Sequence, residues 1–376
     1  MSAIQTEQTE QTEPTEVQTE NINILAVDHM PSPDEIKAKV PLGETAAKVV
    51  AGRQAVTGIL DRRDARLFVV VGPCSIHDPA AGLDYAHRLR ALADEVADTM
   101  LLVMRVYFEK PRTSIGWKGY INDPRMDDSF RIDEGMEKAR RFLHEVATLG
   151  LPIGTEALDP IAPQYYGDLT SWTAIGARTS ESQTHREMAS GLSTPVGFKN
   201  TTDGDIGAAI NAILSAASPH SFLGINTAGQ SAILRTRGNR HGHLVLRGGN
   251  RPNYDSVSVS LAEQGLAKAG LDKNIVIDCS HGNSNKNPEM QPLVMKDVVN
   301  QIREGNRSIV GLMIESNLVA GNQPLTTPAD LSRLKYGCSV TDACVGWETT
   351  VDMIRDAHAV LADVLPDVRS RRGAPA

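Results

Sequence analysis

The side chains best suited to hold a metal ion in this sequence come at or just beyond the ends of short aliphatic runs. Cys74 and His281 lie just beyond such runs and Glu315 ends one, while Asp342 lies in a later loop with the sequence SVTDAC. A thiol, an imidazole and two carboxylates can together bind a divalent ion, and this mixed set fits Mn, Fe, Co and Zn. No compact CxxC or HxxxH pair supports the ion, so the prediction depends on a fold that brings the four residues together.

Six cationic side chains occupy similar places in the sequence. They are Arg105, Lys110, Arg112, Arg178, Lys199 and Arg247. One such cation alone would be ordinary surface charge, but several at the ends of buried strands must be paired or must bind an anion. Guanidinium groups suit the oxygens of carboxylates and phosphates, so we expect small substrates with several negative charges. Gly248 and Gly249, which follow Arg247, would let backbone N–H groups approach an oxyanion closely.

The elements that must position these residues are eight short apolar runs, most of them separated by helical patterns. The runs cover residues 67–72, 101–107, 153–157, 173–178, 196–200, 243–247, 275–278 and 309–315. This alternation predicts a (β/α)₈ TIM barrel, in which catalytic residues lie at the carboxyl ends of the strands. An open doubly wound sheet is the alternative, but the glycine-rich fingerprint that usually follows an early strand of such a sheet is missing from the sequence.

Amino-acid composition and sequence pattern divide the chain into segments. Residues 1–20, rich in Gln, Thr and Glu, are expected to be a disordered tail, and residues 21–65 an N-terminal extension. The barrel is expected over residues 66–366, with an inserted β-hairpin at about 221–236 and a basic tail over 367–376.

Charge and cysteine content narrow the class of protein. The net charge of −8 argues against a nucleic-acid partner, and no apolar run approaches the ~20 residues that span a membrane. The acidic N-terminus is unlike a secretory or mitochondrial presequence. Four cysteines in 376 residues do not make a disulfide framework, so we expect a cytoplasmic protein.

Several longer motifs resemble a known family. They include GPCSIHDP (72–79), KPRTSIGWKG (110–119), IGARTSESQ (175–183), GFKNTTDG (197–204), DCSHGNSNK (278–286) and SVTDACVGWE (339–348). In this order they resemble the type I 3-deoxy-D-arabino-heptulosonate 7-phosphate (DAHP) synthases over about residues 66–350. The resemblance implies condensation of phosphoenolpyruvate with D-erythrose 4-phosphate, with release of phosphate, as the first step of the shikimate pathway.

The resemblance also implies roles for single residues. It assigns one divalent metal ion to Cys74, His281, Glu315 and Asp342. It assigns phosphoenolpyruvate to Arg105, Lys110, Arg178, Lys199 and Arg247, and erythrose 4-phosphate to Lys110, Pro111, Arg112, Thr113 and Ser114. For the reaction that the family catalyses, we expect Lys110 to donate a proton to the new hydroxyl and Glu156 to orient the attacking water.

The family builds its amino-acid feedback site from the extension and the hairpin, so an aromatic amino acid is the expected effector. The matching positions are Pro163, Gln164, Ser193, Phe222, Gly224 and Leu234. Gly224 stands where phenylalanine-sensitive members carry serine, and the loss of that hydroxyl favours the tyrosine-sensitive branch. The resemblance further implies a homodimer or homotetramer.

Three other functions fit parts of the pattern. One is the related synthase that uses arabinose 5-phosphate, although the segment KPRTS argues against it. A non-catalytic barrel that binds anions would not need metal ligands and the full set of cations together. A simple metal-dependent aldolase would release no phosphate from phosphoenolpyruvate.

Overall fold

The computed structural model describes residues 19–112, 116–326 and 328–372. The chain divides into a short unit, residues 1–30, and a main unit, residues 31–376. In the short unit, the Ile24 N–H donates to the Asn21 carbonyl oxygen over 3.0 Å. Most of the tail expected over residues 1–20 lies outside the described residues.

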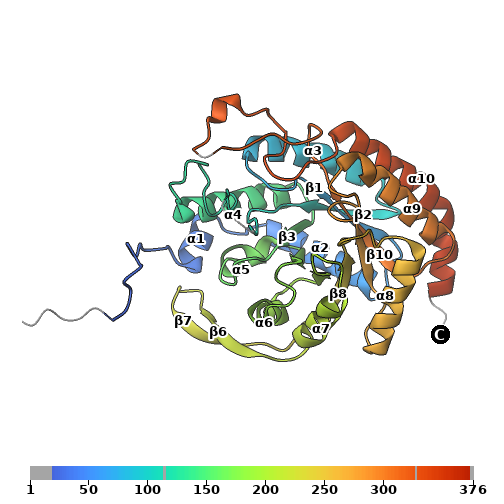
Figure 1. Cartoon of the computed structure of the whole chain (residues 1–376), viewed down its shortest axis with the longest axis horizontal. Helices are drawn as coiled ribbons and strands as arrows, with labels where there is room; N and C mark the ends of the chain where they lie inside the picture. Colours follow the sequence, from blue (N-terminus) through green and yellow to red (C-terminus); the bar gives the residue numbers. More distant parts are fainter. Residues whose placement is uncertain (1–18, 113–115, 327, 373–376) are drawn as a thin grey trace, which may run out of the picture. The chain divides into compact units, whose positions relative to one another are not determined.

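The main unit is built around a closed barrel of eight parallel strands (Figure 1), in the order β1-β10-β9-β8-β5-β4-β3-β2. The strands are β1 (Leu67–Gly72), β2 (Met100–Arg105), β3 (Ile153–Glu156), β4 (Trp172–Ile175), β5 (Val196–Lys199), β8 (Gly242–Leu246), β9 (Ile275–Asp278) and β10 (Ile309–Glu315). All eight predicted runs contribute a strand, so the predicted (β/α)₈ fold is confirmed and the open sheet is wrong. Both faces of these strands are covered, which explains why they read as continuous aliphatic runs rather than alternating ones.

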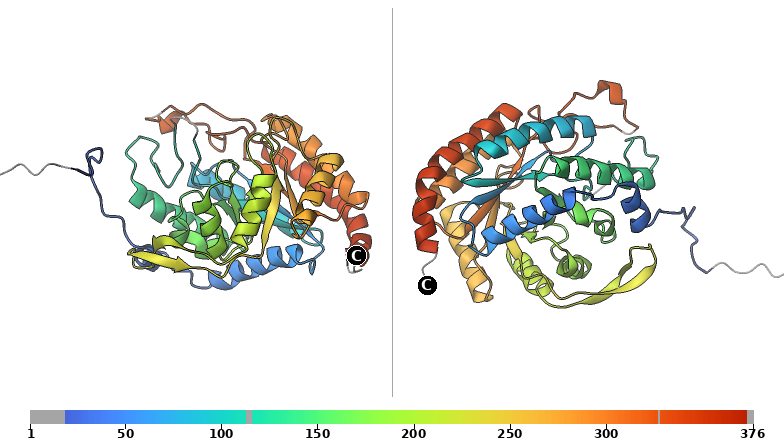
Figure 2. Two further views of the ribbon diagram at one scale, coloured as in Figure 1. Left: turned by 60° about the horizontal axis from the view of Figure 1, so that its bottom comes forward. Right: turned by 180° about the vertical axis from the view of Figure 1, so that it is seen from behind.

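Helices surround the barrel, and Figure 2 shows them from two further sides. They are α3 (Pro79–Glu95), α4 (Ile132–Thr148), α5 (Pro163–Tyr166), α6 (Gln183–Gly191), α7 (Gly207–Ala216), α8 (Ser256–Lys268), α9 (Gln291–Arg303) and α10 (Trp347–Arg372). Asp78 caps the N-terminus of α3, because it accepts from the N–H groups of Ala80 and Ala81 over 2.9 and 3.3 Å. Among the described residues, no helix combines the length and apolar character that crossing a membrane requires.

The connection between β3 and β4 departs from the regular pattern. It contains only the four-residue helix α5 and the 3-10 turn η1 (Gly167–Leu169). The other connections that run directly from one barrel strand to the next, such as α3 and α4, carry longer helices. The wall formed by β3 and β4 therefore lacks the long covering helix that a regular barrel would place there.

A polar pair lies within the apolar barrel core. The Trp172 indole N–H donates to Nε2 of His243 over 3.0 Å, and Nδ1 of His243 lies 3.1 Å from the His241 carbonyl oxygen. Burial lowers the pKa of His243 to about 4, so this ring is neutral near pH 7 and carries its proton on Nδ1. Gly197 leaves the space for the indole, because a Cβ there would lie 2.6 Å from a ring carbon of Trp172.

The N-terminal extension forms α1 (Pro33–Lys39) and α2 (Thr45–Leu60). On α2, Val56, Ile59 and Leu60 pack against the barrel core, in a cluster that includes Phe68 and Trp172. Helix α2 therefore contributes to the core of the barrel.

The predicted inserted hairpin is present between α7 and β8. It consists of β6 (Ser221–Ile225) and β7 (Ser231–Arg235), which pair antiparallel. The start of α1 contacts its turn, where the Asp34 N–H donates to the Thr227 carbonyl oxygen over 2.9 Å. At the base of the hairpin, the Thr236 hydroxyl lies 2.7 Å from that of Ser190 on α6.

The last helix is longer than its apolar pattern indicates. The apolar pattern in the sequence ends at Leu365, whereas α10 continues to Arg372. The expected boundary of the basic tail at residue 367 therefore lies inside a helix, and residues 373–376 are outside the described part of the chain.

Candidate active site

A cavity of about 290 Å³ opens at the carboxyl ends of the barrel strands. Ten residues predicted from the sequence line it, namely Arg105, Lys110, Pro111, Arg112, Glu156, Arg178, Lys199, Arg247, His281 and Asp342. Thr113 and Ser114, predicted on the same loop as Lys110, lie outside the described residues. The structure thus brings both predicted sets of side chains, the cations and the metal-capable group, to one place.

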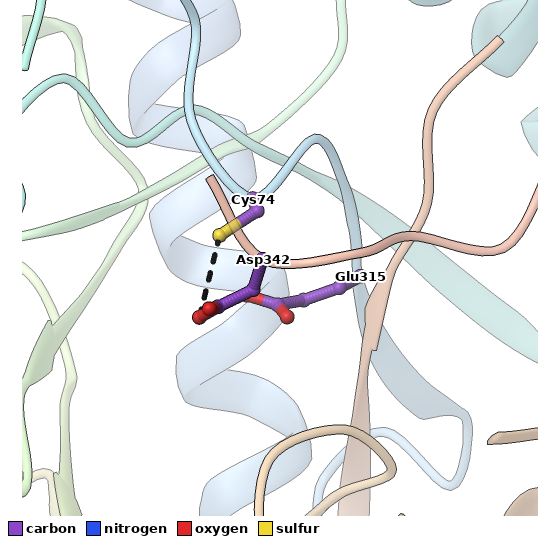
Figure 3. A group of neighbouring side chains, drawn as sticks. All are labelled: Cys74, Glu315 and Asp342. Carbon is purple, nitrogen blue, oxygen red and sulfur yellow. Dashed lines mark hydrogen bonds between the residues drawn. The ribbon is translucent and has the colours of Figure 1, made fainter. Parts of the chain in front are cut away.

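Three of the four predicted metal ligands converge beside this cavity (Figure 3). One ligand atom each from Cys74, Glu315 and Asp342 lies within 4.8 Å of the others, and Cys74 Sγ is 3.9 Å from Oδ2 of Asp342. The barrel brings Cys74 and Glu315 together, because β1 and β10 are hydrogen-bonded neighbours with Gly72 opposite Glu315. Cys74 and Glu315 are buried and Asp342 is exposed, so the group is open on one side.

His281, the fourth predicted ligand, lies next to this trio but is not one of the three that meet within 4.8 Å. Its Nε2 is 3.7 Å from Oε1 of Glu315, and its Nδ1 is 2.8 Å from Oδ2 of Asp278. The backbone of His281 is left-handed, with φ of 55°, which is uncommon outside glycine. The loop after β9 therefore holds the ring between two carboxylates. An imidazole, a thiol and two carboxylates this close together suit a divalent ion.

Buried ion pairs orient the deepest of the cations. The Arg105 guanidinium donates to Oε1 of Glu315 over 2.9 Å, and these two side chains are 1% and 0% exposed. It also lies 3.6 Å from the ring centroid of Tyr107, in a cation–π contact. Burial opposes ionisation of Glu315, but His281, Arg105 and Lys110 together lower its pKa to about 2. Glu315 is thus a carboxylate throughout the working pH range of most enzymes.

Lys110 belongs to the cationic set and also contacts Cys74, a member of the trio. Its ammonium group donates to the carbonyl oxygen of Cys74 over 3.1 Å, and its Nζ lies 3.2 Å from the Cys74 sulfur. Burial and the nearby Glu315 carboxylate raise the pKa of the Cys74 thiol, although Lys110 and Arg105 act in the opposite direction. The lysine is therefore placed to act both on the sulfur and on a molecule in the cavity.

The two remaining deep cations differ in how they are held. Lys199 donates to Oδ2 of Asp278 over 3.0 Å, and both side chains are buried. The guanidinium of Arg247 is within reach of the Gly248 carbonyl oxygen at 3.3 Å. Burial and the neighbouring Arg178 lower the pKa of Arg247, against the opposite effect of Asp278. An anion bound beside Arg247 would offset the effect of Arg178 on its charge.

Two participants were not predicted from the sequence. Asp278 ends β9 and contacts both Lys199 and His281, yet only its neighbours in the DCSHGNSNK motif were singled out. Glu109, directly before Lys110, is 3% exposed, and its carboxylate accepts from the Asp159 N–H over 3.3 Å and from the Tyr166 hydroxyl over 3.4 Å. For Asp278 the signal was available, because it is a charged residue at the end of a strand.

The buried carboxyl group of Glu109 should make the stability of the folded protein depend on pH. Burial raises its pKa from 4.5 to about 8, and the nearby Asp159 adds to this effect. Between those two pH values the folded protein keeps a proton that the unfolded chain releases, so this group lowers the free energy of unfolding as pH rises. We expect Glu109→Gln to melt several degrees higher than the parent at pH 8.5 and close to it at pH 5. Thermal melts across this range measure the difference, and a difference that does not grow with pH would contradict the assignment.

The residues predicted for the effector divide between two places. Pro163, Gln164 and Ser193 line a second cavity, of about 240 Å³, beside the short α5 connection. Phe222, Gly224 and Leu234 lie on the hairpin and are not among the residues that line it. Phe222 and Leu234 are direct cross-strand neighbours, and a Cβ on Gly224 would lie 2.6 Å from Leu234 Cδ1.

A parallel barrel that gathers a thiol–carboxylate trio and anion-binding cations at its strand ends is typical of a metal-assisted enzyme acting on phosphorylated substrates. The chain belongs to the DAHP synthetase I family, whose sequence model matches residues 39–355.

Known proteins resemble the chain over almost its whole length. It is 56% identical to the Tyr-sensitive phospho-2-dehydro-3-deoxyheptonate aldolase of Salmonella typhimurium, over 92% of this chain and 97% of that protein. It is 50% identical to the Phe-sensitive enzyme of Escherichia coli, over 95% and 99% of the two chains. The solved structure of the aldolase of the same name from Francisella tularensis matches with a TM-score of 0.88 at 46% identity, over 90% of this chain and 99% of that one.

Proposed function

We propose that the chain condenses phosphoenolpyruvate with D-erythrose 4-phosphate to DAHP and inorganic phosphate, the first step of the shikimate pathway. The observation that carries this proposal is the convergence of the trio Cys74, Glu315 and Asp342 with five cations around one cavity. The names of the relatives, all phospho-2-dehydro-3-deoxyheptonate aldolases, support it. The loop KPRTS at 110–114 favours erythrose 4-phosphate over arabinose 5-phosphate.

We assign the metal site to Cys74, His281, Glu315 and Asp342. The proximity of His281 Nε2 to Glu315, at 3.7 Å, and the grouping of the other three within 4.8 Å support this set. A divalent ion bound there supplies a Lewis acid that polarises the aldehyde oxygen of erythrose 4-phosphate. The S, N and O donors fit Mn, Fe, Co and Zn alike, and do not select among them.

We assign the carboxylate and phosphate of phosphoenolpyruvate to five of the cations that line the cavity. They are Arg105, Lys110, Arg178, Lys199 and Arg247. Arg105 and Lys199 are held in place by Glu315 and Asp278 before any ligand arrives, so binding loses little side-chain freedom. These contacts fix the substrate so that its C3 faces the aldehyde.

The second substrate is assigned to the loop that begins at Lys110. Arg112 lines the cavity and is aimed by a hydrogen bond from its Nε to the Trp117 carbonyl oxygen over 2.8 Å, which suits it to bind the sugar phosphate. Pro111 lines the cavity beside it, and the assignment extends to Thr113 and Ser114.

The chemistry uses two of the chain's own groups. When C3 of phosphoenolpyruvate bonds to the aldehyde carbon, Lys110 donates a proton to the oxygen that becomes the new hydroxyl. Water oriented by Glu156 then adds to C2 and loses one proton to solvent. As the remaining C2 hydroxyl loses its proton and becomes the carbonyl, the C2–O bond to phosphate breaks, and inorganic phosphate leaves with that proton. Lys110 is suited to hold that proton because Cys74 and Glu315 raise its pKa against the opposing effect of burial.

Initial rates test the proposed reaction. Phosphate release should require phosphoenolpyruvate together with erythrose 4-phosphate, stop on addition of chelator, and return when Mn, Fe, Co or Zn is added back. Arabinose 5-phosphate in place of erythrose 4-phosphate should give little product. Release with arabinose 5-phosphate at an equal rate, or an aldol product without phosphate release, would contradict the proposal.

We propose feedback inhibition by tyrosine, bound in the α5 cavity and influenced by the hairpin. The Tyr-sensitive name of the Salmonella typhimurium relative and the glycine at position 224 support this effector. The contact between Ser190 and Thr236 supports coupling of the hairpin to the residues beside Ser193. Assays with phenylalanine, tyrosine and tryptophan in turn distinguish the three effectors.

Gly224→Ser tests this assignment. Because an added side chain would meet Leu234 Cδ1 at 2.6 Å, the leucine must move and the hairpin face changes shape. We expect the tyrosine concentration for half-inhibition to rise about tenfold, while kcat without effector stays the same. Ser231→Ala, an exposed residue of the same hairpin, is the control and should leave inhibition unchanged. Equal inhibition of the Gly224 variant and the parent would contradict the role of the hairpin.

We also propose that residues 21–65 and the hairpin serve regulation and subunit contacts in a homodimer or homotetramer. Leu223 and Ile233 are cross-strand neighbours that are 85% and 64% exposed, and apolar pairs of this kind are typical of a surface covered by another subunit. Sedimentation velocity would measure the assembly. The four free cysteines support a reducing compartment such as the cytoplasm.

A further inference from the structure

Three asparagines connect the loops that follow β5, β8 and β9, which are neighbouring strands of the barrel. Asn200 directly follows Lys199, Asn253 lies six residues beyond Arg247, and Asn283 lies two residues beyond His281. Asn200 and Asn283 are 0% and 3% exposed. Each asparagine is thus close in sequence to a side chain of the active site, but none of the three lines the cavity itself.

Backbone N–H groups fix the orientation of all three side-chain amides. Oδ1 of Asn283 accepts from the Asn253 N–H over 2.8 Å, and Oδ1 of Asn253 accepts from the Gly248 N–H over 2.7 Å. Oδ1 of Asn200 accepts from the Arg247 N–H over 2.8 Å. Because a backbone N–H can only donate, the atom facing it must be the amide oxygen, and the NH₂ groups point the other way.

The NH₂ groups complete a continuous chain of hydrogen bonds through Asn200, Asn253 and Asn283, which we call the asparagine ladder. Nδ2 of Asn253 donates to Oδ1 of Asn200 over 3.2 Å, and Nδ2 of Asn200 donates to the carbonyl oxygens of Gly248 and Thr201 over 2.9 and 2.8 Å. Nδ2 of Asn283 donates to the carbonyl oxygens of two neighbouring segments. Position 253 therefore needs a short side chain that accepts a hydrogen bond and donates one at the same time, as an amide does.

Gly248 is the segment that this ladder constrains most. Its φ is 70°, and a Cβ there would lie 2.4 Å from the Gly282 carbonyl carbon, so the loops after β8 and β9 are in direct backbone contact. Both polar groups of its backbone are engaged, the N–H by Asn253 and the carbonyl oxygen by Asn200. The direction in which Arg247 enters the cavity depends on this segment.

We propose that Asn253 is a positioning residue for phosphoenolpyruvate: its side chain ties Gly248 to Asn200 and so fixes Arg247 relative to Lys199 for recognition of one phosphate group. The inference rests on the proposed function in one respect, the identity of the phosphorylated ligand. Asn253 acts through the loop and does not contact the ligand.

Asn253→Asp tests the ladder with almost no change of shape. The aspartate keeps an oxygen for the Gly248 N–H, but places a second oxygen 3.2 Å from Oδ1 of Asn200, where two acceptors repel. Asn250→Asp is the matched control, because it adds the same charge to the same loop through an exposed side chain. Asn253→Ala removes both hydrogen bonds without adding charge.

Calorimetric titration of the metal-loaded full-length protein with phosphoenolpyruvate is the primary measurement. We expect the Kd to rise about tenfold in Asn253→Asp and in Asn253→Ala, and to stay at the parent value in Asn250→Asp. In steady-state assays the KM for phosphoenolpyruvate should rise while the KM for erythrose 4-phosphate stays unchanged. A role in general stability alone would instead lower the melting temperature and raise neither constant selectively.

The outcomes separate this inference from the proposed function. Equal affinities for phosphoenolpyruvate in the Asn253 and Asn250 variants would overturn the positioning role. If Asn253→Asp does not fold, Asn253→Ala decides the question by the same titration. A parent enzyme that binds phosphoenolpyruvate but forms no DAHP would overturn the proposed reaction, while the affinities would still decide the role of Asn253.

Discussion

Replacing Cys74 with alanine is expected to abolish DAHP formation, even with excess divalent metal in the assay. Cys74 Sγ is one of three ligand atoms that meet within 4.8 Å, and alanine leaves a buried space with no donor in its place. A site that loses its thiolate loses much of its affinity for Zn, Fe and Co, which bind sulfur well. The measurements are the metal content after dialysis and kcat across a series of metal concentrations.

Cys338→Ala is the matched control for this variant. Cys338 is also a buried free cysteine, but its thiol is not part of the trio. It should keep the activity and metal content of the parent. Full activity of Cys74→Ala would remove Cys74 from the metal site and weaken the assignment of the other ligands.

Lys199→Met is expected to weaken the use of phosphoenolpyruvate and to destabilise the fold at the same time. The methionine keeps an apolar stem but loses an ammonium group that lies in the cavity, so the KM for phosphoenolpyruvate should rise at least about tenfold. The loss also leaves the Asp278 carboxylate, 0% exposed, without one of its basic side-chain partners, and His281, with Nδ1 at 2.8 Å, remains as the other. Removal of one member of a buried pair costs about 3 kcal/mol or more of stability.

A second substitution separates the two effects. In Lys199→Met/Asp278→Asn the buried carboxylate that lost its lysine partner is replaced by a neutral amide, so the melting temperature should recover most of its loss while the KM for phosphoenolpyruvate stays high. Lys138→Met removes a cation from an exposed pair with Glu134 and should change neither quantity. Recovery of KM together with stability would mean that Lys199 acts only through the fold.

The barrel could be predicted because each strand combines a short buried run with a polar residue at its end. That rule placed Cys74, Glu156 and Glu315 on one rim, and the register of β1 against β10 brings the first and the last of these together. The predicted hairpin is also present, as β6 and β7 between α7 and β8, and the helices α1 and α2 precede the first barrel strand.

Other features depend on tertiary contacts that the sequence alone does not reveal. The left-handed backbone of His281 aims its ring between Asp278 and Glu315, and only the packed loop after β9 specifies that conformation. The asparagine ladder joins residues 30 to 53 positions apart through single hydrogen bonds. Neither feature has a periodicity, so neither is visible in hydrophobic patterning.

The short connection between β3 and β4 has a consequence for the evolution of this enzyme. The four residues of α5 leave room outside the barrel wall, and the cavity there is lined by Pro163, Gln164 and Ser193 rather than by catalytic side chains. With the effector bound there as proposed, substitutions on that outer wall would change which metabolite inhibits the enzyme without altering any ligand atom or cation of the active site. Sensing and turnover can therefore diverge independently within one scaffold, which is how isoenzymes with different inhibitors could arise from a common ancestor.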